Sequence, residues 1–138
     1  MFRTYDKIRR YGDDDVQGID KGECSIFPKI DGTCSIVYME DGLLRCASRK
    51  CELSESSTNQ HFYDFVMKRS AGLISLIRMF ETGGFGRVTL YGEWLVPHTI
   101  RTYDGTAWFH WYIFDVFSRT LGRYLTYDGY TELIEIYN

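Results

Sequence analysis

The alternation of apolar and polar residues predicts a β-rich start to the ordered part of the chain. Thr33–Met39 and Leu43–Ser48 are two β-prone runs on either side of Glu40-Asp41-Gly42. An Asp-Gly pair between such runs is a strong hairpin signal, because the turn needs a positive φ that Gly adopts at little cost. A shorter run, Cys24–Phe27, predicts another strand that ends at Pro28.

The middle of the chain has the period of a helix. Apolar residues recur at helical spacing from Phe62 to Phe80. Ser57 and Gln60 form a capping box that would satisfy free N–H groups in the first turn. Gly83-Gly84 ends the predicted helix, since Gly tolerates the left-handed conformation that follows a helix C-terminus. We expect this helix to cover the sheet.

The last third returns to strand patterns. Arg87–Leu95 alternates like a half-buried strand, and Tyr103–Thr106 predicts a turn. Trp108–Phe117 is almost continuously apolar, which is typical of a strand buried on both faces. A second helix begins within Thr131–Tyr137. The predicted class is α+β, with a mostly antiparallel sheet and a covering helix.

Composition bounds what the chain is. Its 138 residues are 44% hydrophobic and 25% charged, which fits one globular domain or a piece of a larger one. The 17% aromatic content excludes disorder over most of the length, because such a chain can bury a core. No apolar run approaches the roughly 18 residues of a membrane span. The N-terminus lacks the apolar region of a signal peptide, so we expect an intracellular, cytoplasmic protein with no membrane partner.

Charge and cysteine usage exclude two further classes. The net charge of −3 excludes a protein that coats nucleic acid by bulk charge, although it leaves room for a local basic groove. The four cysteines have neither the paired spacing of a zinc site nor a disulfide framework, so we expect reduced thiols. The acidic run Asp13–Asp15 is interpreted as a solvated loop rather than a cation site.

One segment, Pro28–Thr33, combines residues that carry chemistry. In a strand, Lys29 and Asp31 would lie on one face, and Gly32 would let the backbone turn or approach a ligand. A lysine in a pocket becomes a nucleophile when desolvation and nearby cations remove its proton. Taken alone the segment is weakly specific, because Lys, Asp and Gly are common in surface turns.

Two other strands supply carboxylates. Leu90–Leu95 places Glu93 beside a glycine, and Trp111–Phe117 places Asp115 inside an apolar run. A buried aspartate is costly without a hydrogen bond or an ion pair, so Asp115 is expected to have a partner. Arg45–Lys50 brings cations to the same sheet.

In this order, the segments together resemble the covalent nucleotidyltransferases, and specifically the ATP-dependent RNA ligases of phages. The resemblance implies an ATP-grasp-like ligase fold, of which residues 1–138 are the N-terminal portion. The segments that carry it are the family start Tyr5–Ile8, motif I in Lys29–Thr33, motif Ia in Ser48–Lys50, motif III in Tyr91–Trp94 with its continuation Leu95–Ile100, and motif IIIa in Tyr112–Val116.

The resemblance implies ligation in three steps. Lys29 attacks the α-phosphate of ATP and forms a lysyl-AMP intermediate, with pyrophosphate as the leaving group. AMP then passes to an RNA 5′-phosphate, and an RNA 3′-hydroxyl displaces it to seal the strand, as in RNA repair. Cations and Mg²⁺ stabilise the charge that spreads over each phosphate.

The resemblance also implies roles for named side chains. Glu93 holds the ribose hydroxyls, and Phe114 stacks on adenine with Tyr112 as its rival for that role. Arg49 reaches the ribose or the RNA 5′-phosphate, while Asp31 and Asp115 orient these groups. The implied nucleotide site comprises Phe27, Lys29, Ile30, Asp31, Arg49, Glu93, Tyr112 and Phe114, and the implied RNA contacts are Arg49, Lys50 and His98.

The sequence departs from the family in two places. Cys34 stands five residues after Lys29, where relatives place Arg or Asn, and a thiol is a weak hydrogen-bond donor. Motif IV, a Glu within an EG[VL]-type strand, has no counterpart, and motif V, a Lys-x-Lys strand, has none because no lysine follows Lys68. A split ligase completed by a second polypeptide, a truncated gene product and a deliberately shortened form are the three explanations. The alternative functions are a degenerate nucleotide- or RNA-binding module and a DNA ligase- or capping-type enzyme.

Overall fold

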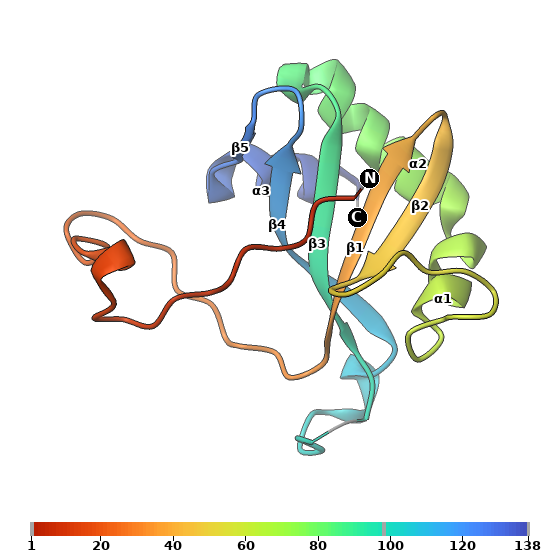
Figure 1. Cartoon of the computed structure of the whole chain (residues 1–138), viewed down its shortest axis with the longest axis horizontal. Coiled ribbons are helices and arrows are strands. Elements are labelled where there is room, and N and C mark those ends of the chain that lie inside the picture. Colours follow the sequence, from red (N-terminus) through yellow and green to blue (C-terminus); the bar gives the residue numbers. More distant parts are fainter. Residues whose placement is uncertain (1, 98, 138) are drawn as a thin grey trace.

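The computed structural model describes residues 2–97 and 99–137, and the side chains of that range as far as residue 135. Its centre is an antiparallel sheet with the strand order β2-β1-β3-β4-β5, so the α+β prediction is confirmed (Figure 1). The strands are β1 Thr33–Glu40, β2 Leu43–Ser48, β3 Val88–Leu95, β4 His110–Ser118 and β5 Arg123–Tyr124.

The predicted hairpin is confirmed. Glu40 and Leu43 are the last paired residues of β1 and β2. Between them, Asp41 and Gly42 adopt φ values of 51° and 75°. Positive φ at both central positions is the geometry of the turn that suits the twist of two paired strands.

The predicted covering helix is present but broken. It consists of α1 Phe62–Lys68 and α2 Ser70–Phe80, separated at Arg69. The capping box is wrong, because the N-cap residue is His61 in a left-handed conformation, with no side-chain cap. The end of the helix at the Gly pair is confirmed, since Gly84 has a φ of 89° within the π-helical turn η2 Glu81–Phe85.

The second half differs from the prediction mainly in burial. Strand β3 is buried on both faces rather than half-buried, whereas β4 is fully buried only from Val116 onward. The turn before β4 forms the short helix η3 Gly105–Ala107, where Asp104 accepts a hydrogen bond from the Thr106 amide. Helix α3 Tyr127–Tyr137 confirms the second helix and begins earlier than predicted.

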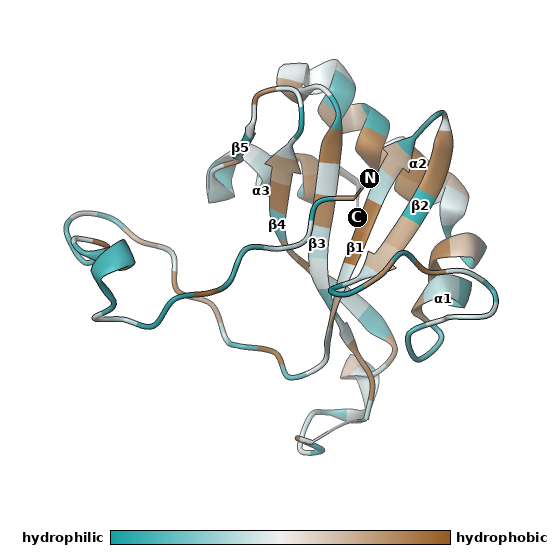
Figure 2. Cartoon of the chain, viewed as in Figure 1, coloured by the Kyte–Doolittle hydropathy of each residue, from teal (hydrophilic) through white to brown (hydrophobic). Residues whose placement is uncertain are grey.

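The sheet has two unlike faces. On the face that we call the helix face, sheet residues such as Val37, Leu90 and Val116 pack against apolar residues of all three α-helices. Figure 2 shows the apolar stripes along the central strands. On the opposite face, a smaller buried cluster contains Ile36 and Tyr91. The N-terminal segment Phe2–Asp6, here called the strap, crosses this strap face in Figure 1.

Between the strap and β1, the segment of residues 7–32 loops away from the sheet and returns to it at its end, just before β1 (Figure 1). This segment contains the short helix η1 Asp14–Val16, and its acidic run is exposed, as expected of a solvated loop. The predicted strand at Cys24–Phe27 is wrong, because this segment pairs with no strand in the described part of the chain. Ile26 is accordingly 88% exposed.

Two further features concern the helices and the cysteines. Within the described residues, none of the helices has the length and apolar character needed to cross a bilayer. All four cysteines are free thiols: Cys24, Cys34, Cys46 and Cys51.

Candidate functional site

The candidate site begins where the chain enters β1 and passes the end of β3. A Cβ atom on Gly32 would overlap the Trp94 carbonyl oxygen and lie 3.1 Å from the Glu93 side chain. Without that atom the backbone comes close enough for the Gly32 amide to donate a hydrogen bond of 3.0 Å to Glu93 Oε1. Glycine at this position therefore fixes the Glu93 carboxylate against the segment that carries Lys29.

Asp31 is tied to a different part of the chain. Its amide donates a 2.8 Å hydrogen bond to Tyr103 Oη, and its carboxylate Oδ2 accepts one of 3.1 Å from the Ile100 amide. The prediction that Lys29 and Asp31 share one face of a strand is wrong, because β1 begins only at Thr33. Asp31 instead anchors the loop after β3 beside the start of β1.

Several charged groups act on the Glu93 carboxylate. Burial raises its pKa, while the Gly32 amide and the positive charges of Lys29 and Arg49 oppose that rise. Cys34 is the cross-strand partner of Glu93. Burial and the Glu93 charge raise the pKa of its thiol, against the effect of Arg49. The predicted residues Lys29, Arg49 and Glu93 thus lie close enough to interact electrostatically.

A cavity of about 350 Å³ lies beside these groups. Pro28 and Ile30, which flank Lys29, line one side of it. The other lining residues are Phe27 in the segment before β1, Tyr112, Ile113 and Phe114 in β4, and Tyr127, Tyr130, Thr131, Ile134 and Glu135 in α3. The structure therefore brings together four predicted site residues, and it adds helix α3, which sequence reasoning did not connect with the site.

Phe114 reaches this cavity because of a β-bulge. In the pairing of β3 with β4, Tyr91 lies opposite Asp115 and Gly92 lies opposite Ile113, so Phe114 has no cross-strand partner. A bulge leaves one residue unpaired and re-aims its side chain. Gly92 permits this geometry, since a Cβ atom there would overlap the indole of Trp111 and lie 2.7 Å from the Tyr112 carbonyl oxygen.

Asp115 has a hydrogen-bond partner, as the sequence predicted, and that partner is a tyrosine. Tyr5 Oη in the strap donates a 3.0 Å hydrogen bond to Asp115 Oδ2, and the Val116 amide donates one of 2.9 Å to Oδ1. Burial raises the pKa of Asp115, and the two hydrogen bonds oppose the rise. Sequence reasoning missed Tyr5, although it lies in the segment that resembles the family start.

The predicted RNA contacts lie at the edge of this region. Arg49 and Lys50 are exposed and follow directly after β2. His98 lies outside the described residues. No group of three or more His, Cys, Asp or Glu side chains gathers into a metal site within the described part of the chain.

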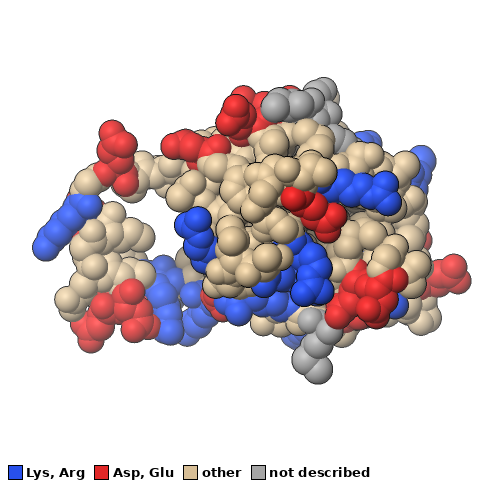
Figure 3. Space-filling model, turned by 90° about the horizontal axis from the view of Figure 1, so that it is seen from above, with Lys and Arg blue, Asp and Glu red and all other residues tan. Residues whose placement is uncertain are grey.

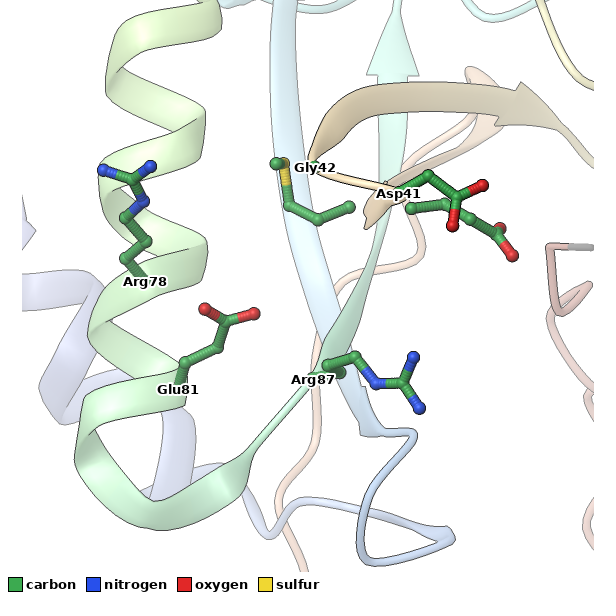
Figure 4. A pocket seen from close by; sticks show the side chains of 7 residues that line it. Asp41, Gly42, Arg78, Glu81 and Arg87 are labelled. Carbon is green, nitrogen blue, oxygen red and sulfur yellow. The ribbon is translucent and has the colours of Figure 1, made fainter.

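A second hollow, of about 300 Å³, lies at the opposite end of β1 and contains none of the predicted site residues. Figure 4 shows Arg78, Glu81 and Arg87 around it, near the hairpin turn at Asp41 and Gly42. Its charges are of both signs. Figure 3 likewise shows basic and acidic side chains interleaved over the body of the molecule.

Comparisons with known proteins agree with this architecture. Solved RNA ligase mutants from Naegleria gruberi share the fold, and no curated protein matches the chain. An apo mutant has 21% identity and a TM-score of 0.60, over 80% of this chain and 30% of its own. A mutant with ATP and Mn has 22% identity and a TM-score of 0.58, over 78% of this chain and 30% of its own. A mutant with AMP and Mn has 21% identity and a TM-score of 0.57, over 78% of this chain and 30% of its own.

The chain thus spans about three-tenths of the length of these ligases, and at such low identity the likeness concerns the fold. The family assignment rests on a separate match. The family model described as RNA ligase matches residues 22–138, which is most of the sequence. This chain belongs to the RNA ligase family.

Proposed function

We propose that this chain is part of an ATP-dependent RNA ligase, and that it takes AMP from ATP onto Lys29. One observation carries the proposal: the residues on either side of Lys29 line an aromatic cavity, while its charge acts on Glu93. A nucleophile, a carboxylate and an apolar pocket with few polar groups are the usual parts of a site for a small ligand.

The cavity suits the adenine base. Its volume lies within the range of roughly 300–1,000 Å³ that is common for ligand pockets. We assign the stacking role to Phe114, with Tyr112 as the rival, because base stacking needs an exposed aromatic face. Phe27 and Ile30 complete the walls. Glu93, fixed by the Gly32 amide, would accept hydrogen bonds from the ribose hydroxyls.

The transfer step balances as a substitution at phosphorus. The neutral Lys29 amine donates its lone pair to the α-phosphorus and forms an N–P bond. The bond from that phosphorus to the bridging oxygen breaks, and its electron pair leaves with pyrophosphate. The amine proton passes to solvent. Arg49 adds positive charge near the phosphates.

ATP would enter as its magnesium complex. Mg²⁺ is usually held by substrate phosphates together with one or two carboxylates rather than by a complete protein cage. Asp31 follows Lys29 closely in the chain, and the charge of Lys29 acts on the carboxylate of Glu93. These two carboxylates are therefore compatible with that mode of Mg²⁺ binding. The ion would neutralise phosphate charge.

The later steps concern RNA, and we propose them for the complete ligase. AMP would pass to an RNA 5′-phosphate, and an RNA 3′-hydroxyl would displace it. Arg49, Lys50 and His98 are the proposed contacts to the RNA ends. Because this chain corresponds to 30% of the Naegleria ligases, we also propose that the equivalents of motifs IV and V come from a second polypeptide or a further part of the protein.

Incubation with α-phosphate-labelled ATP and Mg²⁺, followed by denaturing electrophoresis, tests the first step. We expect a labelled band that disappears in Lys29→Ala. Lys21→Ala is the matched control, because Lys21 is also an exposed lysine of the 7–32 segment. Label retained by Lys29→Ala would contradict the assignment of the nucleophile. A folded wild-type chain that takes no label would contradict adenylation by this chain and favour a nucleotide- or RNA-binding module.

A further inference from the structure

We propose that Tyr5 and Tyr130 are positioning residues that hold the bulged Phe114 in place for base stacking, one from each side of the sheet. This inference rests on the proposed function, since it names what orients the stacking side chain. It concerns two tyrosines from opposite ends of the chain that meet at consecutive residues of β4.

The bulge creates the need for such support. An unpaired residue in a bulge lacks the ladder hydrogen bonds that fix its neighbours. Phe114 is the residue that the pairing of β3 with β4 skips, and it lines the cavity beside Lys29. The direction of its ring must therefore be set by contacts outside the ladder.

Tyr5 supplies these contacts from the strap face. Its ring packs edge-on against Phe114, with the ring centroids 5.0 Å apart. Its hydroxyl donates to the carboxylate of Asp115, the next residue along β4. An aromatic edge contact and a hydrogen bond to a charged acceptor are each directional, so the pair defines both the place and the tilt of the bulge.

Tyr130 supplies the second contact, from the helix face. It lies in α3 and is only 5% exposed. Its hydroxyl donates a 2.8 Å hydrogen bond to the backbone carbonyl of Phe114. Burial raises the pKa of Tyr130 to about 12, so the hydroxyl keeps its proton for this bond at neutral pH. Phe114 is thus held through its ring on one side and through its backbone on the other.

Isothermal titration of the full chain with two probes tests the proposal. One probe is α,β-methylene-ATP, which carries the base and cannot release pyrophosphate; the other is inorganic triphosphate, which has no base. We expect Tyr5→Phe and Tyr130→Phe each to weaken binding of the analogue by about three- to tenfold, the effect of one lost hydrogen bond. Binding of inorganic triphosphate should not change.

Tyr124→Phe is the matched control. Tyr124 also joins the strap to the sheet, through a 3.1 Å hydrogen bond to Asp6, but it makes no hydrogen bond at the bulge. We expect it to leave both affinities unchanged. In a Phe114→Ala background, Tyr5→Phe should have no further effect, because the side chain that Tyr5 positions is gone.

Equal weakening of both probes by Tyr5→Phe would overturn the proposal, and so would a loss of affinity that persists in the Phe114→Ala background. Tyr5→Phe alone carries the test if Tyr130→Phe does not fold. A folded wild-type chain that binds neither probe overturns the proposed function itself. The two failures are therefore distinguishable.

Discussion

The two faces of the sheet are packed with different kinds of side chain. Against the helix face, α1 and α2 bury aliphatic and aromatic side chains such as Phe62, Leu76 and Ile77, each at most 1% exposed. The strap face also buries tyrosines and carries the carboxylate to which Tyr5 Oη donates, and Phe2 and Tyr5 of the strap pack on it.

This difference implies that one face contributes mainly to folding stability and the other mainly to the geometry of the candidate site. Apolar burial is non-directional and contributes most of the folding free energy. Tyrosine hydroxyls and carboxylates contribute less, but they bond in defined directions and so can orient a neighbouring group. We therefore expect substitutions on the helix face to act mainly on unfolding, and those on the strap face to act mainly on geometry and ligand binding.

The largest expected effect is on the helix face. Phe62 is fully buried and packs against Phe65, Trp94 and Trp111. Phe62→Ala should lower the free energy of unfolding by about 3–5 kcal/mol, because it leaves a cavity that the neighbours cannot fill. Urea denaturation measures this loss. Phe109→Ala, at a site 60% exposed, is the control for burial, and an equal loss there would show that burial does not set the cost.

The second effect comes from the bulge that joins the two faces. Gly92→Ala places a methyl group against the Trp111 indole and the Tyr112 carbonyl. We expect a loss of about 1–3 kcal/mol, typical of an overpacked interior. Gly105→Ala is the matched control, since no atom lies within 4 Å of a Cβ at that glycine. Equal stability of the two variants in urea would show that the bulge adjusts freely.

Short-range features of this fold could be predicted from the sequence. The hairpin at Asp41-Gly42 and the end of the helix at Gly84 depend on the φ preferences of single residues. The failures have longer-range causes. Cys24–Phe27 has the composition of a strand, but no strand of the sheet lies beside it. The predicted capping box is wrong because Gln60 and His61 adopt positive φ. The pattern of apolar and polar residues does not indicate that backbone conformation.

The candidate site shows the same division. Lys29, Glu93 and Phe114 were predicted as site residues because their local motifs resemble those of a family, and these assignments remain predictions. Tyr5 and Tyr130 were missed, because a tyrosine near either end of the chain carries no sign of the strand that it will contact. The bulge that leaves Phe114 unpaired depends on the register between β3 and β4. Register is set by packing across the sheet rather than by either strand alone.

A pH titration sharpens the comparison at Asp115. Because its pKa is raised above the ordinary value of 3.8, the folded state binds its proton more tightly than the unfolded state. The resulting stability is fully present below pH 3.8 and is lost as the pH rises through the raised pKa. Asp115→Asn removes this dependence.

Relative to the wild type, Asp115→Asn should therefore become more stable as the pH rises from about 3 to 7, by less than the core substitutions cost. Urea denaturation at several pH values measures the difference. Asp128→Asn, an exposed site at the start of α3, is the control. A difference that falls with rising pH would show that the hydrogen bonds from Tyr5 and Val116 outweigh burial.

The smallest expected effect tests an exposed ion pair at the edge of the strap face. Arg45 Nη1 lies 3.1 Å from Glu52 Oε1, and both side chains are 42% exposed. Arg45→Ala should cost about 0.2–1 kcal/mol at low salt, since solvent screens such pairs. Arg9→Ala breaks the exposed pair with Asp15 in the 7–32 segment and is the control. If Arg45→Ala cost as much as Phe62→Ala, and the cost persisted at high salt, polar contacts would stabilise the fold as strongly as the apolar core. The separation between a stabilising face and an orienting face would then be wrong.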